Sequence, residues 1–272
     1  MTYNLTVSVV LFNTDEDEIL NIIKIISKTS LKTKLFFIDN SPNNNSEAVV
    51  KSKKGVDYIY TGENLGFGKG HNIAINYAKE NSEYHLILNA DVDFNALILE
   101  EMIQYMDSNK DVGLMAPKVL NPDGSLQYTA RLLPTPFYLI FRRFIPIESI
   151  KDRMNQKFEL KDFDLENPIE APFFIGCFLL LKSEAIKKVG GYDDRYFMYM
   201  EDIDLVRRIH EHYKTTYYPF CSIVHKHGKG SYNNKKLLKY HLNSSIQYFN
   251  KWGWVFDKQR VKINNKILNQ LK

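Results

Sequence analysis

The chain has 272 residues, of which 44% are hydrophobic and 25% charged, and a formal net charge of +4. This length exceeds one average domain and falls short of two, and the apolar share can form a sizeable core, so we expect a compact enzyme-sized protein. The small net charge gives no support for nucleic acid as a partner. Two distant cysteines, Cys177 and Cys221, form neither a disulfide framework nor a zinc spacing and suit a reducing cytosol.

The chain shows no targeting segment. Residues 1–10 lack a basic stretch ahead of a long apolar run, so we predict no signal peptide. The most apolar stretch, residues 173–181, is far shorter than the roughly 20 residues that span a bilayer. We therefore expect a cytoplasmic protein.

The first half of the chain alternates strands and helices. Short apolar runs predict strands over residues 6–12, 34–38, 56–60 and 84–88. Between them, apolar residues at helical spacing predict helices, for example Ile19, Ile22, Ile23 and Ile26. This alternation indicates a mostly parallel sheet with helices on both faces, in which ligands bind at the carboxyl ends of the strands. Asp39, the glycine-rich loop 62–70 and the pair Asp91/Asp93 all fall at such ends.

The second half is less regular. We predict a buried strand over residues 173–181, a helix from Ser183 closed by Gly190-Gly191, and a helix from about Glu201. Residues 215–224 resemble a strand broken by Pro219, and a helical tail begins near residue 235. No linker separates two domains.

Asp91-Val92-Asp93 is the first motif with chemical potential. Two carboxylates at i and i+2 of an extended segment project to one side. Such pairs bind Mg²⁺ or Mn²⁺ together with substrate phosphates, and the cation then neutralises a leaving diphosphate. The alternative is a pair of solvated turn aspartates.

Asp202 is the second candidate. Leu205, Val206 and Ile209 follow it at i+3, i+4 and i+7, which puts Asp202 on the apolar face of a helix at its first turn. Glu201, Asp204 and Arg208 are expected on the outer face. An inward carboxylate at a helix start is positioned for general-base catalysis. A capping aspartate explains the same position equally well.

Two further features are less specific. His225 ends the predicted strand 215–224, where it can act as a third metal ligand, an orienting group or a structural residue, and its neighbour His227 leaves the choice of histidine open. The loop 62–72 allows close backbone approach to a ligand. It fits neither the dinucleotide fingerprint, because His71 stands at the third glycine position, nor a Walker loop, and a tight turn into a helix is the alternative.

In order and spacing, these motifs resemble family 2 glycosyltransferases of the GT-A fold, near the bacterial rhamnosyltransferase-like branch. The matching stretches are VSVVLFN (7–13), FIDNS (37–41), ENLGFGKGHNIAI (63–75), LILNADVD (86–93), GLMAPKVLNPDGSLQYTAR (113–131), GCFLLLKSEAIKKVGGYDDRYFMYMEDIDLVRRI (176–209) and PFCSIVHKHGKGS (219–231). The resemblance implies an α/β, Rossmann-like GT-A domain over residues 1–230, with a nucleotide-binding half (1–110) and an acceptor and catalytic half (111–230). Residues 231–272 would form a C-terminal helical tail.

The resemblance also implies roles for individual residues. For the donor nucleotide it implies Phe12 beside the base, Asp39 on the pyrimidine, Asn64, Gly66 and Asn72 in the pocket loop, Asp91 near the ribose, and Arg131 facing the diphosphate or the acceptor. It implies Asp202 as the catalytic base and Asp93, Asp91 and His225 as the metal-binding residues, with Asp93 as the main ligand. Many relatives read Asn-Pro-Asp where this chain has Asn89-Ala90-Asp91, which keeps the carboxylates but loosens the turn.

The activity implied by the resemblance is inverting, metal-dependent transfer of a sugar from a dTDP- or UDP-sugar, with dTDP-rhamnose first, to a glycan acceptor in bacterial surface polysaccharide synthesis. UDP-hexose, UDP-N-acetylhexosamine and UDP-galactofuranose donors stay open. The acceptor would be a lipid-linked saccharide, and residues 131–150 and the tail with Trp252 and Trp254 are candidates for peripheral contact with the inner face of the cell membrane.

Three rival functions are weighed against this one. A sugar nucleotidyltransferase needs a glycine-rich basic loop after the first strand, where this chain has residues 12–16, FNTDE. An oxidoreductase is disfavoured by the failed glycine pattern. A non-catalytic sugar-nucleotide-binding protein has no need for Asp202 together with Asp91, Asp93 and His225.

Overall fold

The computed structural model describes residues 2–51, 53–141, 145, 147–226 and 235–270. Within these residues, the chain forms one central ten-stranded sheet and a separate two-stranded sheet. The main path of the central sheet runs β3 (Val56–Tyr60), β2 (Thr33–Asp39), β1 (Tyr3–Leu11), β4 (Ser82–Leu88), β11 (Phe178–Lys182), β6 (Val112–Leu120), β12 (Lys214–His225) and β5 (Val92–Asp93). Two short strands lie off this path: β7 (Leu126–Gln127) pairs with β6, and β9 (Ile169–Glu170) pairs with β12.

The predicted mostly parallel sheet is confirmed. Strands β3, β2, β1 and β4 pair in parallel, and so do β6 and β12. Strand β11 lies between β4 and β6 and is antiparallel to both, so β4 and β6 share one direction. The carboxyl ends of β1, β2, β4, β6 and β12 therefore meet at one edge, and β11 begins at that same edge.

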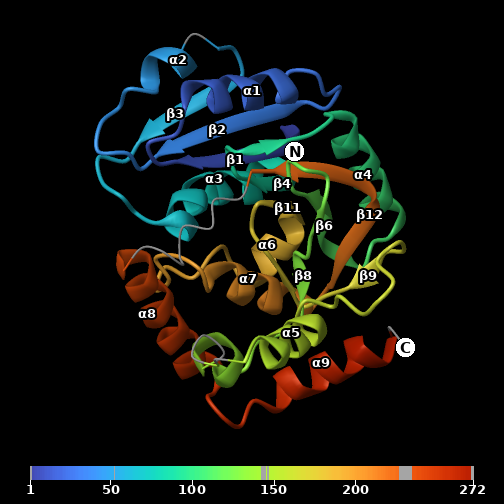
Figure 1. Ribbon diagram of the computed structural model, residues 1–272. Coiled ribbons are helices and arrows are strands. Elements are labelled where there is room, and N and C mark those ends of the chain that lie inside the picture. Colours follow the sequence, from blue (N-terminus) through green and yellow to red (C-terminus); the bar gives the residue numbers. More distant parts are fainter. Residues whose placement is uncertain (1, 52, 142–144, 146, 227–234, 271–272) are drawn as a thin grey trace.

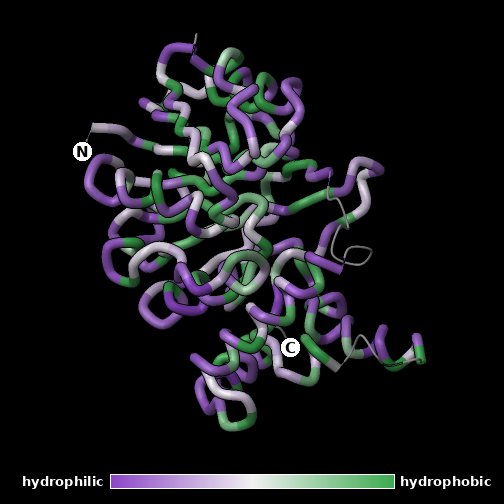
Figure 2. The backbone as a smooth tube through the Cα atoms, turned by 90° about the vertical axis from the view of Figure 1, so that its left-hand side faces the viewer, coloured by the Kyte–Doolittle hydropathy of each residue, from purple (hydrophilic) through white to green (hydrophobic). Residues whose placement is uncertain are grey.

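Helices cover both faces of the sheet, because side chains along each strand alternate between two hydrophobic clusters. On β11, Leu180 packs into one cluster, whereas Leu179 and Leu181 pack into the other. The first cluster is covered by α1 (Glu16–Ile26), α2 (Glu47–Lys51) and α4 (Leu97–Ser108), and the second by α3 (Phe67–Asn81), α6 (Ser183–Val189) and α7 (Glu201–His210). Figure 1 shows α1 and α2 above the strands and α6 and α7 below them. In Figure 2 the hydrophobic segments gather in the middle of the molecule.

Two expectations for the second half were wrong in detail. The run 173–181 is not one strand: β10 (Phe173–Phe174) pairs with β8 (Ala130–Arg131) in the small sheet, and β11 joins the main sheet. Pro219 does not break its strand either. Strand β12 continues through it with a register irregularity between Tyr218 and Ser222, which accommodates a residue without an amide hydrogen.

The C-terminal helices pack against the rest of the chain. The π-helix η1 (Phe137–Phe141), α5 (Glu148–Phe158), α8 (Lys235–Trp252) and α9 (Lys258–Gln270) lie together at the bottom of Figure 1. Arg207 of α7 forms a bidentate ion pair with Asp257 at 2.7 and 2.8 Å, and both side chains are almost fully buried. Within the described ranges, no helix is long and apolar enough to cross a membrane.

This packing overturns the expectation that Glu201 and Asp204 face outward. Glu201 is 2% exposed and Asp204 is fully buried. Asp204 accepts hydrogen bonds from Trp252 Nε1 (2.8 Å) and Arg208 Nε (2.8 Å), and pairs with Lys251 (2.6 Å). On the face of α7 that was expected to be solvated, Asp204 is covered by Trp252 and Lys251 of α8.

Candidate active site

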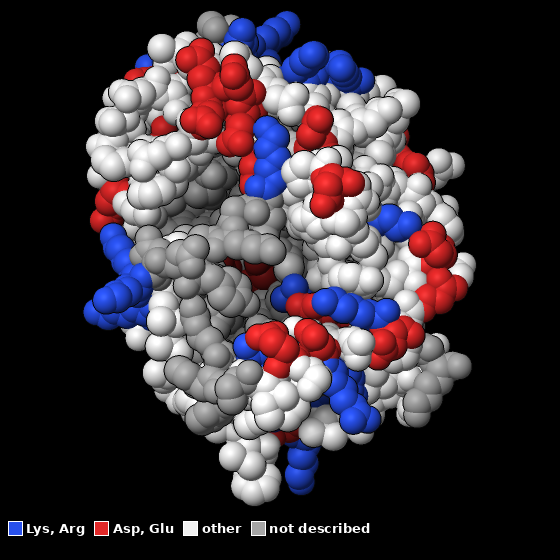
Figure 3. Space-filling model, in the orientation of Figure 1, with Lys and Arg blue, Asp and Glu red and all other residues white. Residues whose placement is uncertain are grey.

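The candidate site lies at the edge where the parallel strands end. The segment after β4 is held there by the backbone of Asn89, whose N–H donates to the carbonyl of Cys177 just before β11 (2.9 Å). Asp39 ends β2 and His225 ends β12 at the same edge. Figure 3 shows that this face of the molecule is hollowed, with acidic side chains visible at the floor. The edge therefore combines carboxylates, a histidine and a concave surface.

Asp202 is held at this site by two hydrogen-bond donors. The Gly176 amide donates to Oδ2 (3.0 Å), and the Tyr192 hydroxyl donates to Oδ1 (2.9 Å). A Cβ atom at position 176 would lie 2.2 Å from Oδ1, so only glycine allows this approach. Because the bonded hydroxyl and amide fix both oxygens, the carboxylate has one defined orientation at the N-terminal turn of α7.

Burial sets the protonation of this part of the site. Desolvation raises the pKa of Asp202 above that of an ordinary aspartate, and the bonds from Tyr192 and Gly176 partly oppose it. Desolvation and the adjacent Asp202 carboxylate raise the pKa of Glu201 further. Among the described residues, Glu201 Oε2 has no hydrogen-bond partner. A raised pKa suits a carboxylate that takes a proton near neutral pH.

Asn72 positions Tyr192. Its Oδ1 accepts from the Tyr192 amide (2.8 Å), and its Nδ2 donates to the Tyr192 carbonyl (2.8 Å) and to Asp194 Oδ1 (2.9 Å). The Asn72 side chain, which was expected in the nucleotide pocket, thus forms its hydrogen bonds with the segment that carries Tyr192. Tyr192 was missed from the sequence, where its only signal is its place after Gly190-Gly191.

The structure brings Asp91 and His225 together. Asp91 Oδ1 lies 3.4 Å from His225 Nε2, and Asn89 Nδ2 lies 3.4 Å from the same nitrogen. On the other side of the ring, Gln127 Nε2 donates to the His225 carbonyl (2.7 Å), so Gln127 Oε1 is left to accept from Nδ1 (3.1 Å). Nδ1 then carries the hydrogen in the neutral ring, and Nε2 presents its lone pair toward Asp91.

Charge reinforces this pairing. Burial alone would lower the pKa of His225, but its interactions with the Asp91 carboxylate and with Cys177 together outweigh burial and raise the pKa to about 10. The proton favoured by this raised pKa is the one on Nε2, which faces Asp91. A metal ion bound at Nε2 would take the place of that proton. His227, the rival histidine, lies outside the described residues.

Asp93 lies apart from this pair. Its Oδ1 accepts a long hydrogen bond from Asn21 Nδ2 of α1 (3.4 Å), and its side chain is exposed. Asp91 precedes β5 in a turn, so the strand alternation that predicted one shared side does not extend to it. Within the described part of the chain, no three His, Cys, Asp or Glu side chains form a group that could hold a metal on their own.

The expected nucleotide side contains Asp39, Phe12, Asn64 and Gly66. Asp39 is fully buried, and its carboxylate accepts from the Ser41 amide (2.9 Å) and the Tyr58 hydroxyl (2.6 Å). Phe12 is 50% exposed at the end of β1. These positions combine an exposed ring with buried polar groups, as a base-binding pocket requires.

The loop before α3 depends on Gly66. Asn64 Oδ1 accepts from the Gly66 amide (3.0 Å), and the Gly66 carbonyl accepts from Asn40 Nδ2 (2.9 Å). Gly66 has φ +86°, and a Cβ there would lie 2.3 Å from the Phe197 carbonyl oxygen. The glycine is needed for the close contact with the segment that leads into α7.

Arg131 belongs to the wall of the second half. It pairs with Glu159 (3.2 Å), donates to the Tyr128 carbonyl (3.1 Å) and lies over the Phe158 and Phe173 rings. Arg131, which was expected to face the diphosphate or the acceptor, is therefore engaged in contacts within the protein.

Comparison with known proteins assigns the family. A model of glycosyl transferase family 2 matches residues 6–190, and a model described as the N-terminal domain of galactosyltransferase matches residues 157–228. The chain belongs to glycosyl transferase family 2. The first match spans most of the chain, from β1 through α6, and so includes Asp39, Asn89, Asp91 and Gly176.

Several relatives of this glycosyltransferase are rhamnosyltransferases. The N-acetylglucosaminyl-diphospho-decaprenol L-rhamnosyltransferase of Mycobacterium tuberculosis is 26% identical over 82% of this chain and 78% of its own. Rhamnosyltransferase WbbL of Escherichia coli is 26% identical over 86% of this chain and 88% of its own. These matches confirm the resemblance to a family 2 rhamnosyltransferase-like branch.

Solved structures confirm the GT-A fold. GalNAc-T7 in complex with UDP, GalNAc and Mn²⁺ aligns with a TM-score of 0.63 at 13% identity, covering 93% of this chain and 50% of that one. The mannosyltransferase PcManGT from Pyrobaculum calidifontis in complex with GDP-Man and Mn²⁺ aligns with a TM-score of 0.60 at 15% identity, covering 99% and 75%. At these identities the likeness concerns the fold alone.

Proposed function

We propose that this glycosyltransferase transfers a sugar, with inversion, from a dTDP- or UDP-sugar to a hydroxyl of a lipid-linked saccharide in bacterial surface polysaccharide synthesis. dTDP-rhamnose is the donor we favour, because two relatives are named as rhamnosyltransferases. The observation that carries the proposal is the Asp202 carboxylate, oriented by Gly176 and Tyr192 beside the edge that contains Asp91 and His225.

Asp202 is the proposed general base. It accepts the proton of the acceptor hydroxyl while the hydroxyl oxygen bonds to the anomeric carbon and the bond from that carbon to the diphosphate breaks. A single displacement with one base inverts the configuration at that carbon. The raised pKa of Asp202 keeps it basic enough to remove this proton while the two donors hold it in place.

Asp91 and His225 are the proposed residues for Mg²⁺ or Mn²⁺. One carboxylate oxygen and one imidazole nitrogen at 3.4 Å are a suitable donor pair, and hard cations complete their coordination with substrate phosphates. When bound, the cation supplies positive charge for the departing diphosphate. Asp93, which contacts Asn21 instead, is proposed to act outside the first coordination sphere.

The donor nucleotide is proposed to lie between Phe12 and the Asn64–Gly66 turn. Asp39, buried under this region, would accept from the pyrimidine ring with lone pairs that Ser41 and Tyr58 leave unused. Asn72 and Arg131 contribute by holding neighbouring segments, since their polar groups contact the protein. A UDP-hexose, UDP-N-acetylhexosamine or UDP-galactofuranose donor is the alternative within this site.

The acceptor is proposed to be a saccharide on a lipid diphosphate, because the M. tuberculosis relative is named for a sugar on diphospho-decaprenol. Such an acceptor would bring the enzyme to the inner face of the cell membrane as a peripheral protein.

A panel of nucleotide sugars tested by thermal shift with Mn²⁺ would identify the donor. We expect a dTDP- or UDP-sugar to raise the melting temperature, followed by slow metal-dependent hydrolysis of that donor. Binding of a purine nucleotide sugar alone would contradict the pyrimidine assignment. Binding without hydrolysis or transfer would favour a non-catalytic sugar-nucleotide-binding protein.

A further inference from the structure

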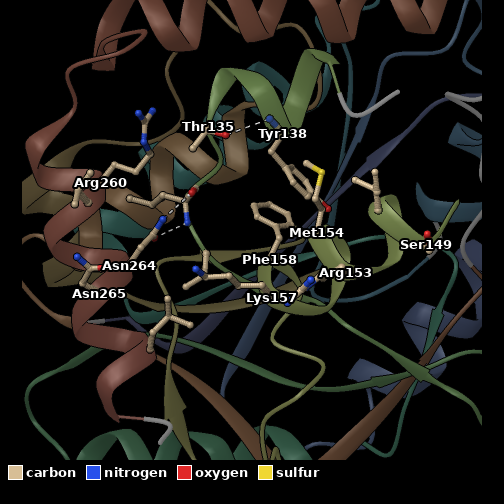
Figure 4. Close-up of a pocket in the computed structure, with 15 residues that line it drawn as sticks. Thr135, Tyr138, Ser149, Arg153, Met154, Lys157, Phe158, Arg260, Asn264 and Asn265 are labelled. Carbon is tan, nitrogen blue, oxygen red and sulfur yellow. Dashed lines mark hydrogen bonds between the residues drawn. The ribbon is translucent and has the colours of Figure 1, made fainter. Parts of the chain in front are cut away.

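A second hollow lies away from the sheet edge, between η1, α5 and α9. Its volume is about 840 Å³, within the roughly 300–1,000 Å³ typical of small-molecule sites. Figure 4 shows Tyr138, Met154 and Phe158 gathered in its middle, with Asn264 and Asn265 on the facing helix α9. Asn264 closes one wall by two hydrogen bonds to the Leu133 backbone, each 2.9 Å. None of the candidate active-site residues lines this hollow.

The lining has the chemistry of an amphiphile site. Its floor is apolar, with the Tyr138 and Phe158 rings stacked at 3.8 Å. At its margin Ile150 and Val261 are 45% and 54% exposed, although water contact with such side chains is unfavourable. The hollow therefore offers apolar surface to a ligand.

The charges of the lining have one sign. Arg153, Lys157 and Arg260 are basic, and none of the described residues that line the hollow is acidic. Arg260 contacts Asp257 (3.8 Å), but Arg153 and Lys157 have no ion pair among the described residues and are exposed. An adjoining hollow of about 510 Å³ shares Arg153 and Lys157 and adds a single carboxylate, Asp162. Two free cations beside an apolar cavity match an anion that carries a hydrocarbon chain.

We propose that this hollow binds the chain of a lipid phosphate, with the phosphate at Arg153 and Lys157 and the hydrocarbon against Tyr138, Met154 and Phe158. That this lipid is the carrier of the sugar acceptor rests on the proposed function. A single hydrocarbon chain can enter a concave site of this volume, whereas the flat surface of a bilayer would leave most of the hollow unfilled.

The backbone connects this hollow to the catalytic base. Leu132, in the wall of the hollow, directly follows β8 in the chain. Strand β8 pairs with β10 through Arg131 and Phe173. Two residues beyond β10, Gly176 donates to Asp202. An amphiphile in the hollow would therefore contact the residue that follows the small sheet, and the other strand of this sheet is followed by the glycine that orients the base.

Calorimetric titration of the whole chain with farnesyl phosphate, below its micelle concentration, tests the proposal. Inorganic phosphate and farnesol separate the head from the chain, and we expect each to bind at least about tenfold more weakly than farnesyl phosphate. Ile150→Asp should weaken farnesyl phosphate binding about tenfold, because it puts a charge against the chain. Its control is Ile246→Asp, at a residue that is also 45% exposed but lies on α8.

Lys157→Glu should weaken farnesyl phosphate about tenfold while leaving farnesol binding unchanged, and Lys188→Glu, an exposed residue of α6, is its control. Equal binding by wild type, Ile150→Asp and Lys157→Glu would overturn the proposal, and so would tight binding of phosphate alone. The thermal shift caused by the donor nucleotide is measured in wild type and in the same variants. If the donor causes no shift in wild type, the proposed function is contradicted. If the donor causes a shift but farnesyl phosphate does not bind, only the lipid site is contradicted.

Discussion

The hydroxyl of Tyr192 offers a sensitive test of how Asp202 is tuned. Tyr192 is 4% exposed, and its hydroxyl donates to Asp202 Oδ1 at 2.9 Å. This bond lowers the pKa of Asp202 against the larger effect of burial. In Tyr192→Phe the carboxylate keeps only the Gly176 amide, so its ionised form is less stable and its pKa rises further.

The magnitude follows from the type of bond. A hydrogen bond to a charged group contributes about 1.5–3 kcal/mol, and about 1.4 kcal/mol corresponds to a factor of ten in ionisation. Transfer requires ionised Asp202, so activity is present above its pKa and is lost as the pH falls through it. On the acidic limb of the pH–rate profile we expect Tyr192→Phe to be about tenfold slower or more, and the limb to lie at higher pH.

The assay is the rate of sugar transfer under saturating donor across a range of pH. Tyr196→Phe is the control: its hydroxyl is also buried but has no hydrogen-bond partner within the described residues. An acidic limb that stays in place in Tyr192→Phe, or moves equally in Tyr196→Phe, would refute the assigned role of this hydroxyl.

Three further predictions concern the base, the metal-binding pair and the buried ion pair. Gly176→Ala should reduce transfer by about 10²-fold or more with donor binding retained, because a Cβ there would lie 2.2 Å from the base; unchanged kcat would contradict this. Asp91→Asn should weaken Mn²⁺-dependent donor binding much more than Asp93→Asn does in the same titration, and the reverse order would restore Asp93 as the main ligand. Asp257→Ala removes the carboxylate that pairs with the buried Arg207 guanidinium and should lower the free energy of unfolding by about 3–5 kcal/mol in denaturant titration. A loss below about 1 kcal/mol would show that the ion pair is not needed.

The layered α/β fold could be predicted because its signals are local. The isoleucine spacing of α1 and the apolar runs of β1 to β4 specify their elements without reference to distant residues. The reversal of β11 and the split at Gly176 could not be predicted. They depend on which strands lie beside 173–182 in space, and the apolar composition of that stretch fits one long strand as well as two.

The site shows the same division. Helical phase placed Asp202 at the first turn of a helix, and it lies there, but the same phase put Asp204 outside. The burial of Asp204 comes from Trp252 and Lys251 of α8, more than 40 positions downstream, which no local pattern reveals. Similarly, the i, i+2 rule assumed one extended segment, whereas Asp91 lies in a turn and meets His225 from another strand.

Asp202→Asn tests the central claim most directly. Asparagine keeps the size of the side chain but cannot take a proton, so we expect the transfer rate to fall by about 10²–10⁴-fold while donor binding, measured by thermal shift, stays near that of wild type. Glu201→Gln is the matched control, because it changes the adjacent buried carboxyl, whose raised pKa keeps it protonated, and should retain most activity. Transfer by Asp202→Asn at near wild-type rate would contradict the assignment of the base.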